Sequence, residues 1–211
     1  MTKSSFILVL LFLGSCSSLP PVAYLDIAKV GYYSIFGYEE VNVTKELLEE
    51  RKYSFAKAKI GNSKEIFIVL LSIEEGTFEW ISQDKVRVFT DHGRIVRVSG
   101  IGRDSFIRQP ISQKSLLDNK DAKIFYETID LFNPDLFSSN LEREVLSIDV
   151  KKSTYLGEVL DVIELVERTQ VKSIGWSAKN IYHYKIDGTP IMTTQEVHPM
   201  LPKIKLEFYY K

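Results

Sequence analysis

The feature that most constrains the fold is a two-residue alternation of apolar and polar side chains, which is clearest near the C-terminus. Between residues 203 and 210 every second side chain is apolar: Ile204, Leu206, Phe208 and Tyr210. Successive side chains of a β-strand point to opposite faces of the sheet. The segment therefore predicts a strand with one buried face and one face in water.

Similar short runs fill the central part of the chain and are separated by turn residues. They occupy residues 53–57, 65–73, 77–82, 85–89 and 94–98. The connections between them are short, and Gly93 stands where a tight hairpin needs a residue that accepts a positive φ. The run at 65–73 is apolar at almost every position, so we expect a central strand that is covered on both faces.

Strand patterns return in the second half of the chain, at residues 144–150, 159–168, 182–187 and 191–197. The stretch 102–140 is less regular, and for it we expect loops, a short helix at 115–119 and one strand at 125–130. Many short strands without parallel crossovers predict a mainly β fold. We expect an antiparallel meander curled into a barrel or half-barrel, with few short helices.

Helical spacing of apolar residues appears before the first strand. It runs from residue 22 to residue 36 and predicts an N-terminal amphipathic helix. Lys29 is the one basic residue of this segment, so we expect the helix to pack against the body rather than lie in a membrane interface. Thr44 is placed to cap a second, brief helix through Leu47 and Leu48.

The first residues have the layout of a secretory signal. An apolar run from Phe6 to Leu13 follows Lys3 and ends in small residues before Cys16, the one cysteine of the chain. The run is shorter than the roughly 20 residues needed to cross a bilayer. Its last four residues resemble a bacterial lipobox, so Cys16 is predicted to be the lipid-attachment residue. The alternatives are an ordinary signal peptide cleaved nearby and a reduced, buried cysteine.

These features divide the chain into a lipoprotein signal peptide at 1–15, a lipidated spacer at 16–21 and a single β-rich domain at 22–211. Long acyl chains on one cysteine would hold the protein on a membrane, since each buried methylene contributes about 0.8 kcal/mol. Ser17 follows the cysteine where some lipoproteins have Asp. A serine directly after the cysteine resembles the outer-membrane sorting signal of bacterial lipoproteins.

The charge balance and the cysteine content argue against nucleic-acid binding and against a disulfide-stabilised fold. The chain has 27 basic and 28 acidic residues and a net charge of -1. This balance predicts no nucleic-acid partner, because such binding needs a clustered basic excess. One cysteine permits no intramolecular disulfide, so an exported protein of this composition relies on strand pairing and burial.

Three blocks of the central region carry a resemblance to a known family: residues 66–70, 80–84 and 93–96. Together with their spacing, they resemble the YjbF/GfcB family of capsule and exopolysaccharide lipoproteins. Residues 182–197 and the C-terminal strand look like the closing part of that family, whereas 106–140 does not match. The resemblance implies a barrel-like lipoprotein of the outer membrane that faces the periplasm. It also implies a gene set for making and exporting group 4 capsule or related exopolysaccharide. No catalytic residue is established for that family, so none is carried over to this chain, and no cofactor is expected.

The histidines and the Ser82–Asp84 pair show no catalytic or metal-binding pattern. His92, His183 and His198 are not spaced as metal ligands, so no metal site is predicted. Ser82 with Asp84 lacks the glycines of a nucleophile elbow and fits a turn at the end of a strand.

Two pairs of carboxylates have the composition of a glycoside hydrolase site. They are Glu74 with Glu75, and Glu164 with Glu167. Such a site would need the two carboxyl groups about 5 to 9.5 Å apart in a cleft. Carboxylates at turns and on the wet faces of strands are common, so the pairs are interpreted as solvated.

Two tryptophans are the candidate ligand-binding residues, because aromatic rings stack on sugar rings and line apolar clefts. Trp80 falls within an expected central strand, where core packing is the alternative. Trp176 falls within the turn-like segment 173–177, where we expect it to be exposed.

Three functions follow from these patterns. The first is a non-enzymatic accessory lipoprotein that binds polysaccharide or proteins of the export machinery. The second is a carrier of a hydrophobic ligand, a lipid or a lipoprotein, which needs a half-open barrel with an unfilled apolar interior. The third is a glycan-modifying enzyme. The sequence does not indicate the oligomeric state.

Overall fold

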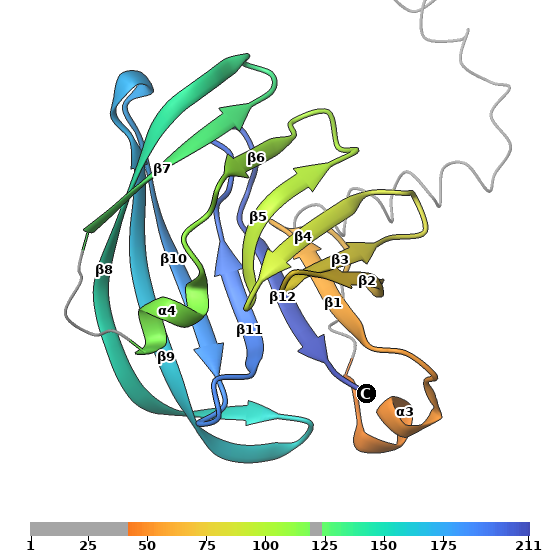
Figure 1. Cartoon of the computed structure of the whole chain (residues 1–211). Helices are drawn as coiled ribbons and strands as arrows, with labels where there is room; N and C mark the ends of the chain where they lie inside the picture. Colours follow the sequence, from red (N-terminus) through yellow and green to blue (C-terminus); the bar gives the residue numbers. More distant parts are fainter. Residues whose placement is uncertain (1–41, 119–123) are drawn as a thin grey trace, which may run out of the picture. The chain divides into compact units, whose positions relative to one another are not determined.

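The computed structural model describes residues 42–118 and 124–211, which fall within one compact unit, residues 39–211. The strands of this part form one closed antiparallel barrel, in which each strand pairs with the next and β12 pairs with β1 (Figure 1). The strands are β1 Phe55–Ile60, β2 Ile66–Glu74, β3 Thr77–Ile81, β4 Arg87–Asp91, β5 Arg94–Ser99, β6 Ser105–Arg108, β7 Ile124–Leu131, β8 Leu136–Tyr155, β9 Glu158–Val171, β10 Trp176–Tyr184, β11 Pro190–Gln195 and β12 Ile204–Tyr209. The short helical elements are α3 Lys45–Glu50, α4 Gln113–Asp118 and the 3-10 turn η1 Lys172–Ile174. The predicted mainly β barrel is confirmed, and it is closed.

The brief helix after Thr44 is also confirmed. The Thr44 hydroxyl accepts a hydrogen bond from the backbone N–H of Leu47 at 3.3 Å and caps α3. Leu47 and Leu48 then pack beside Phe55 and Tyr209 on the outer face of the barrel. The helix expected at 22–36 and the lipid-attachment residue Cys16 lie outside the described residues.

The prediction that the strand at 65–73 is covered on both faces is wrong. Ile68 of β2 points into the core and is 2% exposed, whereas Phe67 and Leu71 are 37% and 55% exposed. An antiparallel barrel encloses only the inner face of each strand, and the outer face meets water unless another element covers it. The apolar composition of β2 therefore does not mark a central layer.

The irregular stretch 102–140 contains more strand than expected. The strand predicted at 125–130 is confirmed as β7, and the predicted short helix is α4. β6 and the first part of β8 were not expected, because β6 has four residues and the first part of β8 contains the polar run Ser138-Ser139-Asn140. These segments become strands by pairing with β7.

One half of the barrel interior is apolar and closely packed. Trp80 of β3 and Phe208 of β12 lie at its centre with ring centroids 5.4 Å apart, and both side chains are fully buried. The small side chains Ala56 and Ala58 of β1 leave room for these rings. The buried rings of Trp80 and Phe208 therefore fill this part of the interior.

The β4–β5 hairpin leans into the barrel and contacts β11. His92 and Gly93 have φ values of 44° and 80°, as the predicted tight turn requires. The Gln195 side chain of β11 accepts a hydrogen bond from the N–H of Ile95 at 2.9 Å and donates one to the carbonyl of Gly93 at 2.8 Å. A Cβ atom on Gly93 would lie 2.8 Å from Cβ of Pro190. The close approach of the β4–β5 turn to β11 therefore requires a glycine at position 93.

The other half of the interior holds a buried ion cluster. Arg94 of β5 donates two hydrogen bonds to Glu127 of β7, at 2.7 and 2.5 Å. Arg143 of β8 donates to Glu167 of β9 at 2.6 Å, and the Tyr182 hydroxyl donates to the same carboxylate at 2.6 Å. The four ionic side chains are at most 2% exposed. Together they connect strands around the interior.

We expect the Glu167→Gln substitution to destabilise the protein by about 3 to 5 kcal/mol at pH 7, because Arg94 and Arg143 then share the single carboxylate of Glu127 and one buried positive charge is left uncompensated. Burial by itself would raise the pKa of Glu167, but the charges of Arg143 and Arg94 outweigh it and hold that pKa below its ordinary value of 4.5. Ionised Glu167 therefore adds stability above that pH, and this contribution is lost as the pH falls through the lower folded pKa.

Urea unfolding of the wild-type protein and of Glu167→Gln measures the cost at pH 7 and its decrease at several acidic pH values. Glu164→Gln is the control. Glu164 lies on the outer face of β9, where it pairs with half-exposed Lys151 and lies 3.0 Å from Nε2 of His183, so its loss is expected to cost less than the loss of the fully buried Glu167. Equal costs for the two variants would contradict the proposed importance of the buried cluster.

A second prediction concerns the close approach of the β4–β5 hairpin to β11. Gly93→Ala and Gly188→Ala both place a side chain at positive φ, but only Gly93 has neighbours within 4 Å of the new Cβ. Overpacking of this kind costs about 1 to 3 kcal/mol, so Gly93→Ala should lower the free energy of unfolding more than Gly188→Ala. If chemical denaturation gives similar decreases in the free energy of unfolding for the two variants, the neighbours of Gly93 adjust to the new side chain and the prediction is wrong.

Candidate ligand-binding site

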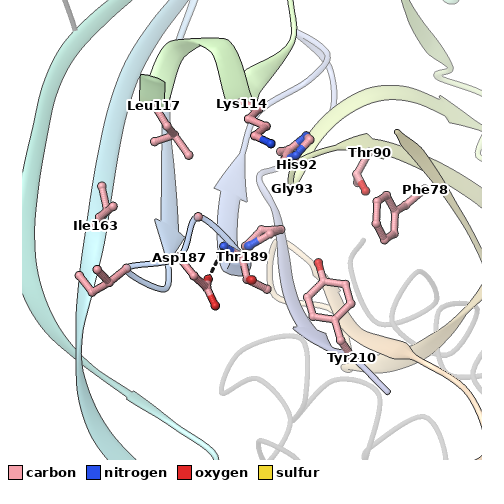
Figure 2. Close-up of a pocket in the computed structure, with 13 residues that line it drawn as sticks. Phe78, Thr90, His92, Gly93, Lys114, Leu117, Ile163, Asp187, Thr189 and Tyr210 are labelled. Carbon is pink, nitrogen blue, oxygen red and sulfur yellow. Dashed lines mark hydrogen bonds between the residues drawn. The ribbon is translucent and has the colours of Figure 1, made fainter. Parts of the chain in front are cut away.

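One end of the barrel, here called the mouth, holds a cavity of about 440 Å³ (Figure 2). Alternate turns of an antiparallel barrel fall at the same end, so the β4–β5 turn, the β6–β7 connection with α4, the β10–β11 turn and the end of β12 meet there. The lining residues are Phe78, Thr90, His92, Gly93, Lys114, Leu117, Ile163, Ile186, Asp187, Gly188, Thr189, Pro190 and Tyr210.

The rings of Phe78 and Tyr210 form an aromatic wall on one side of the mouth cavity. Their centroids lie 6.2 Å apart in an edge-to-face arrangement, and both rings rest on Trp80 behind them, at 6.2 and 6.3 Å. This backing fixes the wall in place, because aromatic contacts of this geometry add to the packing energy. The wall presents apolar ring surface to whatever occupies the cavity.

The opposite side of the cavity is aliphatic. Figure 2 shows Leu117 of α4 and Ile163 of β9 on that side, away from Tyr210. Ile186 of the β10–β11 turn also lines the cavity and is 62% exposed. The cavity therefore accepts a ligand that has apolar surface on two sides.

Polar side chains lie between the two apolar walls. Lys114 of α4 lies near His92 (Figure 2), whose Nδ1 is 2.7 Å from Oδ1 of Asp91. Asp187 accepts a hydrogen bond from the N–H of Thr189 at 2.8 Å, which holds the pKa of Asp187 below its usual value and keeps it ionised at neutral pH. The cavity thus offers hydrogen-bond donors and acceptors, including a positive charge at Lys114 and a negative charge at Asp187, to a ligand with several polar groups.

Asp91 also fixes the position of α4 over the mouth. Its Oδ2 accepts a hydrogen bond from the backbone N–H of Gln113 at 3.0 Å. The one carboxylate therefore joins the first residue of α4 to the β4–β5 turn and to His92. These contacts of Asp91 hold α4, the helix that carries Lys114 and Leu117, beside the cavity.

Neither predicted tryptophan lines the mouth cavity, although Trp80 lies directly behind its aromatic wall. Trp80 is fully buried and its Nε1 donates to the Thr90 hydroxyl at 2.9 Å. The expectation that Trp176 is exposed in a turn is wrong: it begins β10, is 9% exposed and donates to Glu196 at 3.2 Å. The two rings belong to separate core clusters. A ligand role for either ring stays a prediction.

The aromatic residues that do line the cavity were missed by sequence reasoning, although a signal for them exists. Phe78 lies two positions before Trp80 on β3, and Tyr210 lies two positions after Phe208 of β12. The two-residue period of a strand places each of them on the inner face beside the buried ring. They reach the cavity because they lie at the ends of these strands.

The candidate carboxylate pairs are not arranged to act together. Glu167 is buried inside the barrel, whereas Glu164, three positions earlier on β9, lies on the outer face beside Lys151. Glu74 and Glu75 are both exposed at the β2–β3 turn. The positions of these four side chains therefore give no pair that faces one cleft.

The remaining polar candidates have structural partners. The Ser82 hydroxyl accepts a hydrogen bond from the N–H of Val86 at 3.1 Å, as expected for a turn at the end of a strand. His183 lies 3.0 Å from Glu164, and His198 contacts the carbonyl of Phe132 at 3.2 Å. Among residues 42–118 and 124–211, no three His, Cys, Asp or Glu side chains converge as metal ligands. None of the helices in these two ranges is long and apolar enough to pass through a membrane.

Two curated proteins of Escherichia coli (strain K12) are similar to this chain. The uncharacterized lipoprotein YjbF is 27% identical over 107 residues, which cover 51% of this chain and 48% of YjbF. The uncharacterized lipoprotein GfcB is 28% identical over 64 residues, 30% of each chain. The chain thus spans about half of the first relative and about a third of the second.

A solved structure shares the fold. The crystal structure of the hypothetical lipoprotein YmcC from Escherichia coli (K12) superposes with a TM-score of 0.69 and 15% identity, and covers 86% of this chain and 94% of YmcC. The sequence also matches the family described as "Group 4 capsule polysaccharide lipoprotein gfcB, YjbF" over residues 32–209. Because this match covers most of the chain, the protein belongs to the YjbF/GfcB family of group 4 capsule polysaccharide lipoproteins.

Proposed function

We propose that this protein is an outer-membrane lipoprotein that assists the assembly or export of capsule or exopolysaccharide by binding the polymer at the mouth cavity, without catalysing a reaction. Residues 1–15 act as the signal peptide, and acyl chains on Cys16 hold the barrel on the periplasmic side of the membrane. The family match over residues 32–209 is the observation that carries the proposal.

The chemistry of the mouth cavity supports a sugar ligand. A pyranose ring has apolar C–H faces and a polar edge of hydroxyl groups, which matches two apolar walls with polar groups between them. The rings of Phe78 and Tyr210 provide one stacking surface, and Lys114, Asp187 and Thr189 provide donors and acceptors. A volume of about 440 Å³ lies within the usual range of ligand pockets.

The alternative function, a carrier of a hydrophobic ligand, receives less support from the interior. Trp80, Phe208 and the ion cluster of Arg94 and Arg143 occupy the inside of the barrel. A second cavity beside Arg94 holds only about 20 Å³, which is room for about one water molecule and far too little for an acyl chain. An acyl chain of ordinary length would need a continuous apolar channel.

The first test of this proposal concerns Lys114. Its exposed position on α4 makes Lys114→Ala a variant that should fold normally. Loss of a hydrogen bond from a charged group costs about 1.5 kcal/mol, so affinity for polysaccharide should fall about tenfold. Electrophoresis in native gels that contain purified group 4 capsular polysaccharide measures this affinity. Lys179→Ala, which removes an exposed lysine from β10, is the matched control, and equal retardation of the two variants would contradict binding at the mouth.

The second test concerns the anchor and the cellular role. In a strain that lacks the gene, we expect less surface polysaccharide, and a wild-type copy should restore it. A Cys16→Ala copy should leave the outer-membrane fraction and fail to restore the polymer, because the acyl chains supply the membrane affinity. Immunoblots of fractionated cells and a surface polysaccharide assay report the two effects. Unchanged polysaccharide in the deletion strain would refute the proposed role.

A further inference from the structure

A polar groove of about 430 Å³ lies on the outer face of the barrel, beside the β9–β10 connection. Its lining includes Tyr126 of β7, Asn140 and Glu142 of β8, Gln170 of β9 and Lys172 of η1. We call it the outer groove. It shares no lining residue with the mouth cavity, so it is a separate feature of the surface.

Strand register brings three of these side chains into one row. Tyr126 pairs with Glu142 across β7 and β8, and Glu142 pairs with Gln170 across β8 and β9. Paired residues of neighbouring strands point to the same face and lie about 5 Å apart. The row therefore runs straight across three strands on the outside of the barrel.

The polar part of the row is held in a defined arrangement. The Glu142 carboxylate accepts a hydrogen bond from the Lys172 ammonium at 2.6 Å and another from the Gln170 side-chain amide. Lys172 and Gln170 also hold the pKa of Glu142 below its usual value, so the carboxylate stays ionised at neutral pH. Each of these groups keeps further donor or acceptor capacity for a ligand.

Tyr126 is the unusual member of the row, because its side chain remains 68% exposed on a strand face. A tyrosine presents an apolar ring and a polar tip, and such rings are enriched at binding surfaces for that reason. The groove beside it is lined by hydroxyl, amide and ionic groups rather than by apolar side chains. A ligand suited to this groove has one apolar face and many hydroxyl groups.

We propose that the outer groove is a second saccharide site, where a sugar ring of the polymer stacks on Tyr126 and its hydroxyl groups bond to Asn140, Glu142 and Gln170. The identity of the polymer rests on the proposed function, but the site itself does not depend on the mouth cavity. Two sites on one polymer chain strengthen binding through effective concentration. A protein partner would instead favour an apolar core within the contact.

The test compares Tyr126→Ala with Tyr53→Ala, which removes another exposed tyrosine far from the groove in sequence. Mature acylated protein, residues 16–211, is run in detergent in native gels that contain purified group 4 capsular polysaccharide. Loss of the stacking surface should weaken retardation about tenfold, and Tyr53→Ala should leave it unchanged. Asn140→Ala should reduce retardation as well, since it removes a bonding group without touching the ring. Circular dichroism melts show whether each variant is folded.

The outcomes separate this inference from the proposed function. If Lys114→Ala weakens retardation and Tyr126→Ala does not, the outer groove is refuted while binding at the mouth stands. If Tyr126→Ala weakens retardation and Lys114→Ala does not, the outer groove stands and the mouth site fails. If the wild-type protein is not retarded, both saccharide sites are refuted, and the deletion strain alone decides the cellular role. If Tyr126→Ala abolishes cross-linking to another envelope protein but leaves retardation intact, the groove binds protein and the saccharide proposal is wrong.

Discussion

The pairing of β1 with β12 is the constraint on which the rest of the structure depends. It joins segments about 150 positions apart in sequence, from Phe55 opposite Tyr209 to Ile60 opposite Ile204, and leaves the sheet without an edge. Every strand then has one enclosed face and one outer face, which meets solvent except where an element such as α3 covers it. The enclosed faces fill the interior, and the outer faces leave apolar side chains such as Leu71 in contact with solvent. Both candidate sites follow from this division, one inside the mouth and one outside.

The interior combines two kinds of packing that suit a rigid scaffold. Rings around Trp80 fill one half, and the other half contains the ion cluster of Arg94, Glu127, Arg143 and Glu167 together with smaller apolar clusters. Replacement of such clusters by apolar residues is often neutral or stabilising, whereas loss of one partner is costly. The cluster is thus better understood as a fixed arrangement that holds β5, β7, β8 and β9 in place than as a source of net stability. A rigid barrel can present a preformed cavity at low entropic cost.

Sequence reasoning identified most of the strands but located the candidate site poorly. Alternation identified β12, and the turn at Gly93 was evident because only a few residue types accept its conformation. Sequence reasoning chose Trp80 and Trp176 because aromatic rings stack on sugars, while Phe78 and Tyr210 line the cavity. The difference between these rings is their distance from the end of the barrel, which depends on strand tilt and register. Neither quantity is contained in a local pattern.

The sequence by itself determined the mainly antiparallel β class, the short turns and the family resemblance, because these depend on neighbouring residues and on local conformational preference. Only the tertiary structure decided that the barrel closes, that Glu167 and not Glu164 faces the interior, and that Tyr126, Glu142 and Gln170 form a row. These outcomes depend on contacts between distant segments. A change of register by one residue would exchange the inner and outer faces of a strand, so the sites exist only once the whole sheet is assembled.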